Sequence, residues 1–155
     1  MERGGGPTMS HMRQRWLLEF DNDGDCYTVP TDETTLAQAE ALLRELDGER
    51  RWYCALFDDD DEQCMWCYGE PERRLVEVRL WGTPGDPTHF VVARDEPEGP
   101  KAVHVRYESE SSSILHVPSR EVLTASESLQ IFRTWFLTKQ VHHAFLRVPR
   151  RYLYD

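Results

Sequence analysis

The residues of this chain that are most typical of chemistry are its four cysteines, two of which have the spacing of metal ligands. Cys64 and Cys67 form a Cys-x-x-Cys pair, in which two thiolates can bind one zinc ion. A closed zinc site needs two more ligands, which Cys26 and Cys54 could supply. However, the pair lies in a segment with strand-like alternation, where side chains three positions apart point to opposite faces. We therefore expect cysteines that pack within a strand, and keep a small zinc-binding protein that uses all four as an alternative.

The Cys-x-x-Cys pair also occurs in nucleobase deaminases, in which a Pro precedes the first Cys and a His-x-Glu or Cys-x-Glu lies upstream. Here Gln63 precedes the pair, and neither tripeptide occurs before it. The chain also lacks a Gly-rich phosphate loop and the Gly-x-Ser-x-Gly turn of serine hydrolases. His142 and His143 are neighbours in a predicted strand, so we expect them to face opposite sides. These patterns predict a protein that is not an enzyme, with no catalytic residue, no cofactor and no metal site.

Three aspartates near the N-terminus alternate as they do at the start of an EF-hand calcium loop. They are Asp21, Asp23 and Asp25, with Gly24 in the fourth position of the segment. An EF-hand needs Gly in the sixth position and Glu in the twelfth, and neither is present. Asn, Asp and Gly favour tight turns instead, so the segment predicts a hairpin.

A run of acidic residues between two aromatic-rich segments is the most prominent candidate for a binding surface. A charge run is commonly a solvated loop, but aromatic anchors beside charged residues are also typical of protein interfaces. Carboxylates would accelerate docking onto a basic partner and would resemble the phosphates that such a partner binds. The candidate partner-binding residues are Asp58, Asp59, Asp60, Asp61, Glu62, Trp66, Trp81, Glu108 and Glu110.

The charge of the 155-residue chain is −10 and is concentrated in its middle. Residues 19–110 hold 24 carboxylates against nine Lys or Arg side chains. Such a body repels nucleic acid and membrane phosphates and attracts cationic partners. No apolar run approaches the roughly 20 residues of a membrane span, and no secretory signal is visible. We expect a cytoplasmic protein with a disordered leader over residues 1–11 and one domain over 12–155.

Periodicity in the sequence predicts the elements that would position these residues. The predicted strands are 12–20, 26–29, 51–57, 63–68, 73–81, 89–93, 102–107 and 141–148, with a further extended run over 114–118. Two helices are predicted, over 32–47 and 126–137. Thr35 and Thr124 should each cap a helix in a capping box, with Gln38 and Glu127 as their partners. Consecutive strands joined by short turns favour antiparallel pairing, so we expect an α+β fold: an antiparallel sheet with both helices packed on one face.

The order of elements in residues 73–155 resembles the first of the Imm families of bacterial immunity proteins (Imm family one). The matching elements are residues 75–81, 89–93, 103–108, the segment Ile114-Leu115-His116-Val117-Pro118, the helix with Trp135-Phe136-Leu137, and the strand 141–146. The chain departs from the family in two places. Lys139-Gln140 stands where the family usually has Gly after the helix, and Phe145-Leu146 stands where it often has Trp.

The resemblance implies a small α+β protein encoded beside a polymorphic toxin, often a toxin of the deaminase superfamily. It implies that the protein binds and neutralises that toxin, such as a nucleic-acid deaminase, by blocking substrate access to a basic cleft. The acidic composition agrees with this function, because toxins that act on nucleic acid have basic clefts. An acidic protein-interaction adaptor that has no link to a toxin is the other alternative.

Overall fold

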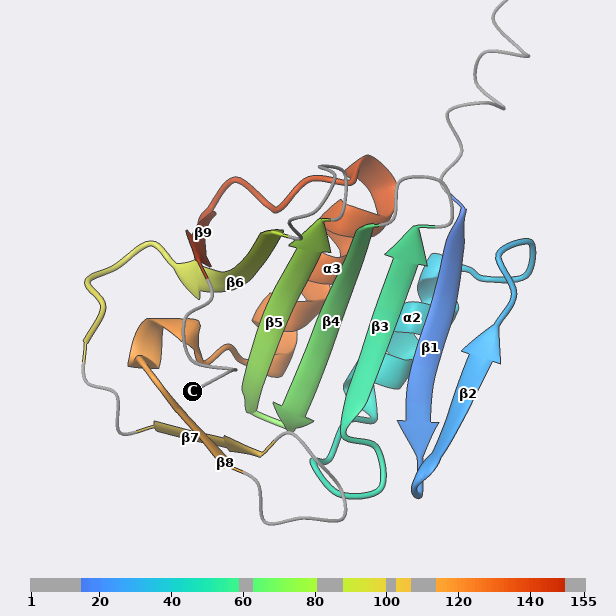
Figure 1. Ribbon diagram of the computed structural model, residues 1–155, viewed down its shortest axis with the longest axis horizontal. Coiled ribbons are helices and arrows are strands. Elements are labelled where there is room, and N and C mark those ends of the chain that lie inside the picture. The colour runs from blue at the N-terminus through green and yellow to red at the C-terminus, as the bar shows by residue number, and fades with distance from the viewer. Residues whose placement is uncertain (1–14, 59–62, 81–87, 100–102, 107–113, 150–155) are drawn as a thin grey trace, which may run out of the picture.

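The computed structural model of the protein describes residues 15–58, 63–80, 88–99, 103–106 and 114–149. Nine strands, two α-helices and one 3-10 helix lie in these ranges (Figure 1). They are β1 (Trp16–Asn22), β2 (Asp25–Val29), α2 (Leu36–Arg44), β3 (Tyr53–Asp58), β4 (Gln63–Glu70), β5 (Arg73–Leu80), β6 (Thr88–Arg94), β7 (Val103–Arg106), β8 (Ile114–Val117), η1 (Ser119–Glu121), α3 (Ala125–Thr138) and β9 (Phe145–Pro149). The predicted leader, residues 1–11, lies outside the described residues.

Seven strands form one sheet in the order β2-β1-β3-β4-β5-β6-β9, and each neighbouring pair is antiparallel. The predicted α+β class and the antiparallel sheet are thereby confirmed. β7 and β8 instead form a separate two-stranded sheet. The expectation of one sheet for all strands was therefore wrong in this part, because β9 occupies the place beside β6.

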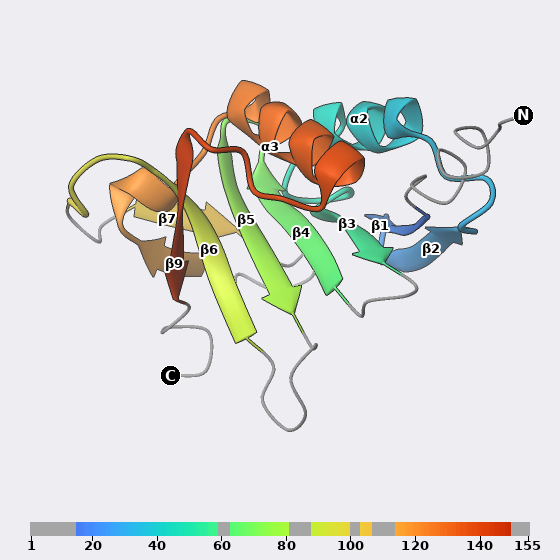
Figure 2. The same ribbon diagram turned by 90° about the horizontal axis from the view of Figure 1, so that it is seen from above.

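The core lies between the sheet and the apolar stripes of α2 and α3, which Figure 2 shows on the upper side of the sheet. The helices contribute Ala39, Leu43, Ile131, Phe132 and Trp135, and the strands contribute Trp16, Leu18, Cys54, Leu56, Met65, Cys67, Val76, Val78 and Val92. Full burial of one large apolar side chain contributes about 1.5–3 kcal/mol, so this cluster is the main source of stability. Neither described helix combines the length and apolar character that a membrane crossing requires.

Both predicted capping boxes are present. The side chain of Thr35 accepts from the backbone N–H of Gln38, and that of Thr124 accepts from the backbone N–H of Glu127. In return, the side chain of Gln38 accepts a hydrogen bond from the backbone N–H of Thr35, and that of Glu127 accepts one from the backbone N–H of Thr124. The first helix is shorter than predicted, because Thr35 is its N-cap and residues 31–33 form a turn.

The aspartate-rich segment that joins β1 to β2 forms the predicted hairpin. Asp23 and Gly24 both have positive φ, at 58° and 93°, and Asn22 pairs with Asp25 across the turn. Two central residues with positive φ give the turn whose twist matches that of the flanking strands. Asp23 and Gly24 therefore form the β-turn, while Asp21 lies in β1 and Asp25 in β2.

The segment before β9 differs from its predicted strand. β9 begins at Phe145, and the backbone N–H of Phe145 donates to the carbonyl of His142 in a turn. The rings of His142 and His143 stack with their centroids 4.6 Å apart. The expectation that these side chains face opposite sides was wrong, because the alternation of a strand does not extend to a turn.

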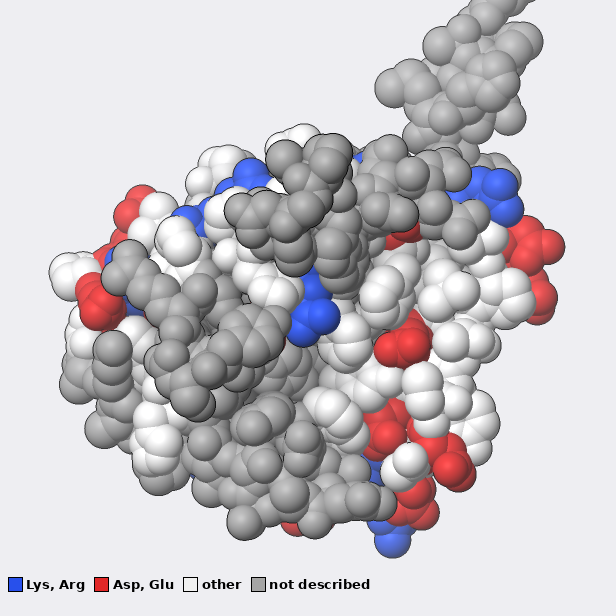
Figure 3. Space-filling view, in the orientation of Figure 1, with Lys and Arg blue, Asp and Glu red and all other residues white. Residues whose placement is uncertain are grey.

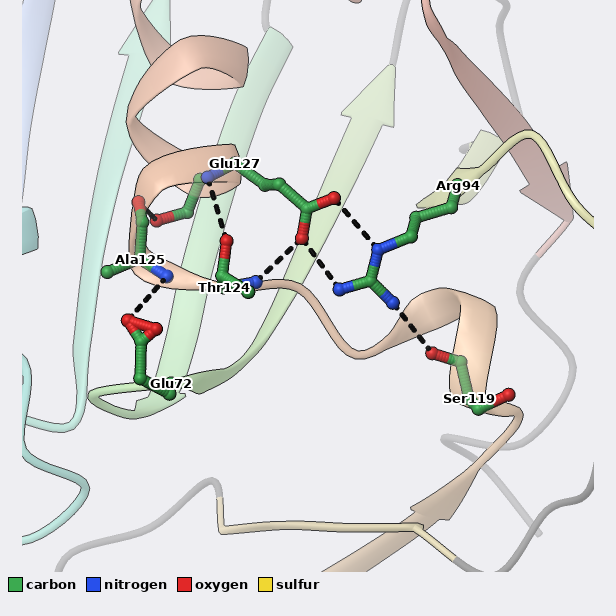
Figure 4. Close-up of polar contacts among 7 residues, drawn as sticks. Glu72, Arg94, Ser119, Thr124, Ala125 and Glu127 are labelled. Atoms are coloured by element: carbon green, nitrogen blue, oxygen red, sulfur yellow. Dashed lines mark hydrogen bonds and ion pairs between the residues drawn. The ribbon is translucent and has the colours of Figure 1, made fainter.

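An ion pair with several hydrogen bonds ties α3 to β6 and η1 (Figure 4). The guanidinium of Arg94 donates to both carboxylate oxygens of Glu127, at 2.8 and 2.7 Å, and to the carbonyl of Ser119 at 3.3 Å. Glu127 also accepts from the backbone N–H of Thr124 at 2.9 Å. Burial alone would raise the pKa of Glu127, but the hydrogen bonds from Arg94 and Thr124 outweigh it and lower the pKa below 4.5.

Because the pKa of Glu127 is lowered on folding, its charge stabilises the protein above pH 4.5, and this contribution is lost as the pH falls through the lowered value. We predict that Glu127→Gln reduces the free energy of unfolding at pH 7 by about 1–3 kcal/mol. In urea titrations at several pH values, the deficit should shrink in acid. The exposed Glu98→Gln should have no such effect, and a deficit independent of pH would contradict the account.

Candidate protein-interaction face

Of the residues predicted to bind a partner, the structure describes Asp58 and Trp66. Asp59, Asp60, Asp61, Glu62, Trp81, Glu108 and Glu110 lie outside the described residues. Asp58 and Trp66 belong to the neighbouring strands β3 and β4 but serve different sides of the sheet. Asp58 pairs in register with Trp16, whose side chain is in the core between the sheet and the helices. Trp66 pairs with Ala55, and both belong to a second apolar cluster on the other face of the sheet.

Asp58 is held inside the molecule. Its side chain is buried and forms an ion pair with Lys139. Lys139 caps the C-terminus of α3 in a left-handed conformation, with φ of 59°. The first residue of the acidic run therefore connects the end of β3 to the end of α3 on the helix side of the sheet.

Four aromatic side chains gather on the face of the sheet that points away from the helices. They are Trp52, Tyr53, Phe57 and Trp66, and we call them the aromatic face. The rings of Tyr53 and Trp66 stack with centroids 5.1 Å apart, and Phe57 meets Trp66 edge-on at 5.6 Å. Trp52 lies against Tyr53 at 4.6 Å. Three of the four, all except Tyr53, are only partly buried, so their rings are available for contact.

This arrangement follows from the pleat of two paired strands. Tyr53 and Phe57 are four positions apart in β3 and therefore face the same side. Trp66 in β4 pairs with Ala55, which places its ring between them. Val117 and Val122 pack in the same cluster and cover the neighbouring part of this face.

Trp66 is held in place by two neighbours. Its indole N–H donates to the sulfur of Cys64 at 2.9 Å. The guanidinium of Arg79 lies over the indole, 5.5 Å from its ring centroid, in a cation–π arrangement. A ring that is already oriented loses less entropy when a partner binds, which suits Trp66 to the role of an anchor.

Three carboxylates lie beside the aromatic face, namely Glu19, Asp21 and Glu77. The hydroxyl of Tyr53 donates to Glu19 at 3.1 Å, and it also lies 3.3 Å from the sulfur of Cys26. Burial raises the pKa of Asp21, while hydrogen bonds from Gly24 and the Trp52 side chain oppose the rise. Glu77 is buried in the position that pairs with Trp66. Figure 3 views the molecule from this side and shows Asp and Glu side chains among uncharged surface over β1, β2 and β3.

The sequence patterns did not indicate Glu19 or Glu77 as candidates, and they placed Asp21 in a turn. The signal for Glu19 and Asp21 is their two-residue spacing in β1, which puts both on one face. Only the strand order shows that this face continues into Tyr53 and Trp66.

The four cysteines do not come together. Cys54 and Cys67 face each other in the helix-side core. Cys64 lies under Trp66 on the other face, and Cys26 is exposed on β2. In the part of the chain that the structure describes, no three His, Cys, Asp or Glu side chains are grouped as metal ligands.

Comparisons with protein-family models, with curated proteins and with solved structures found no match to this chain.

The positions of the cysteines predict their reactivity. Burial raises the pKa of the Cys64 and Cys67 thiols to about 12 and raises that of Cys54 well above its ordinary value, so these three remain protonated at neutral pH. We predict that a thiol reagent at pH 8 labels Cys26 within minutes and the other three only after denaturation. Mass spectrometry of labelled peptides checks this, and rapid native labelling of Cys64 or Cys67 would contradict it.

Proposed function

We propose that this protein is an immunity protein that binds a cognate toxin in the cytoplasm and blocks access of the toxin's substrate to a basic cleft. The observation that carries this proposal is the aromatic face with Glu19 at its edge, since the other two neighbouring carboxylates, Asp21 and Glu77, are buried. Oriented, partly exposed aromatic rings next to negative charge provide both the anchors and the charge complement that a basic partner requires. The net charge of −10 adds long-range attraction for such a partner.

The fold supports this assignment because the main apolar core and the aromatic face lie on different sides of the sheet. We infer that the two helices pack on one face of the sheet and that the other face is used for the partner. A specific interface needs about 800 Å² from each protein, of which a few anchors supply most of the binding energy. Trp66 lies at the centre of the aromatic face and is the anchor that we propose. The order of elements that resembles Imm family one supports a toxin as the partner, and a nucleic-acid deaminase is the class that this resemblance favours.

An adaptor for another basic protein would use the same surface, so the partner distinguishes the two functions. Co-expression with the product of the neighbouring gene should give a complex and should restore growth if that product is a toxin. Recovery of housekeeping proteins alone would favour the adaptor.

The first prediction concerns the anchor. We expect Trp66→Ala to weaken binding of the neighbouring gene's product about 30-fold or more, since a central aromatic anchor contributes about 2 kcal/mol or more. Glu19→Gln should weaken binding only a few-fold, because it removes a charge but leaves an acceptor for Tyr53. Calorimetric titration measures both.

The matched control for the anchor is Leu137→Ala, which truncates a 59 % exposed apolar side chain on α3. This variant should bind like the wild type. Thermal unfolding of each variant shows whether Trp66→Ala remains folded. Full affinity in folded Trp66→Ala would remove the aromatic face from the interface.

The second prediction concerns the acidic run. Because Asp58 is buried against Lys139, the variant should replace only Asp59, Asp60 and Asp61, each with Ser. We expect slower association with the partner and a weaker dependence of the association rate on salt, while dissociation changes little. Stopped-flow measurements between low and physiological salt test this. Asp58→Ser alone should instead lower stability, and unchanged association of the triple variant would show that the run is only solvated.

A further inference from the structure

The strand β2 forms one edge of the seven-stranded sheet, and no described element lies beyond it (Figure 1). The first four of its five residues are exposed, including Tyr27, whose side chain is 45 % accessible. An edge strand carries a row of backbone N–H and C=O groups that can pair with another chain. Proteins that have no use for such an edge block it.

The hairpin geometry identifies which backbone groups point outward. Asn22 and Asp25 close a two-residue turn and form a hydrogen-bonded pair, and these pairs alternate along an antiparallel ladder. Tyr27 and Val29 therefore direct their backbone groups toward β1. Cys26 and Thr28 direct theirs away from it, and neither takes part in a further backbone hydrogen bond among the described residues.

This edge lacks three of the devices that commonly prevent strand addition. These three are Lys side chains, prolines within the strand, and bulges. β2 has no Lys, its register with β1 is continuous over five pairs, and Pro30 follows the strand without interrupting it. The two outward-facing residues can thus offer two donors and two acceptors in line.

The charge around this edge selects what can pair with it. From Trp16 to Leu43 the chain contains seven carboxylates and no Lys or Arg. Two arginines from outside this range reach the ends of the hairpin, where Arg15 donates to Thr31 and Arg51 donates to Asn22. Figure 3 shows acidic side chains along β1 and β2. A second copy of the protein would bring like charges together, whereas a basic segment would be attracted. Cys26 also contacts Tyr53, so the edge is continuous with the aromatic face.

We propose that β2 docks an extended, basic segment of the partner protein, which adds to the sheet as an eighth strand beside it. The main chain of Cys26 and Thr28 pairs with this segment, and Asp23, Asp25 and Glu19 attract its Arg or Lys side chains. Strand addition supplies affinity through the main chain, and the flanking carboxylates supply selectivity. This inference rests on the proposed function, because it specifies how that partner is held.

Thr28→Pro tests the inference, because proline removes the outward N–H of Thr28 and leaves the hydrogen bonds of Tyr27 and Val29 to β1 intact. Proline is tolerated where an edge strand's N–H faces solvent. Thr28→Ala is the matched control, since it removes the side chain and keeps the N–H. The probe is a capped eight-residue peptide of alternating Thr and Arg, and the comparison peptide alternates Thr and Glu.

We expect the Thr-Arg peptide to shift the amide resonances of Cys26 and Thr28 in the full-length protein, and the Thr-Glu peptide to leave them unchanged. Thr28→Pro should bind the basic peptide roughly tenfold or more weakly, and Thr28→Ala should bind it like the wild type. A Thr-Arg peptide N-methylated at alternate residues lacks the complementary bonds, which its own N–H groups would donate to the carbonyls of Cys26 and Thr28, and should also bind weakly, even if Thr28→Pro is destabilised. Equal binding of the methylated peptide, shifts confined to other strands, or no binding to the wild type would overturn the inference.

The same variants separate this inference from the proposed function. If the wild type and Thr28→Pro bind the neighbouring gene's product equally, strand addition is refuted and the neutralising function stands. If the wild type does not bind that product at all, the proposed function fails, and the peptide experiment still decides the edge. Self-association of the wild type that Thr28→Pro abolishes would show that a second copy occupies β2, which contradicts the inference.

Discussion

The packing of α3 onto the sheet is the interaction on which the rest of this molecule depends. Its buried side chains Ile131, Phe132 and Trp135 join the strands in one core. Polar contacts fix the position of the helix along its length. Arg74 donates to Ser128 at 3.0 Å near one end, and the indole of Trp16 donates to the carbonyl of Phe136 at 3.0 Å near the other. These contacts hold α3 over one face of the sheet and leave Tyr53 and Trp66 on the opposite face.

The pleat of the strands then divides the reactive and charged residues between the two faces. It places Cys54 and Cys67 in the closed core, and Asp58 also points inward to Lys139. On the other face it aligns Tyr53 with Trp66. Residues that are close in the sequence, such as Cys64 and Cys67, therefore lie on opposite faces of the sheet. The aromatic face, in turn, is assembled from side chains of β3 and β4.

Local signals in the sequence predicted the local structure well. The two capping boxes, the Asp-Gly hairpin and most strands follow from side-chain chemistry within a few residues, and the structure confirms them. Long-range placement could not be predicted in this way. Whether β7 and β8 joined the main sheet depended on β9, which follows them in the chain. The inward direction of Asp58 likewise depended on Lys139, which lies 81 positions away. The structure places Trp66 in β4 with its side chain partly exposed, but the neighbouring carboxylates became visible only with the strand order; the role of Trp66 in binding remains a prediction.

The central claim is that the surface formed by β2, β3 and β4 on the open side of the sheet holds another protein. Hydrogen–deuterium exchange of the full-length protein, alone and with the neighbouring gene's product, tests it most directly. The account predicts slower exchange in Asp25–Val29, Tyr53–Asp58 and Gln63–Glu70 on binding, with little change in α2. Slower exchange confined to α2 and α3, with these strands unchanged, would contradict it.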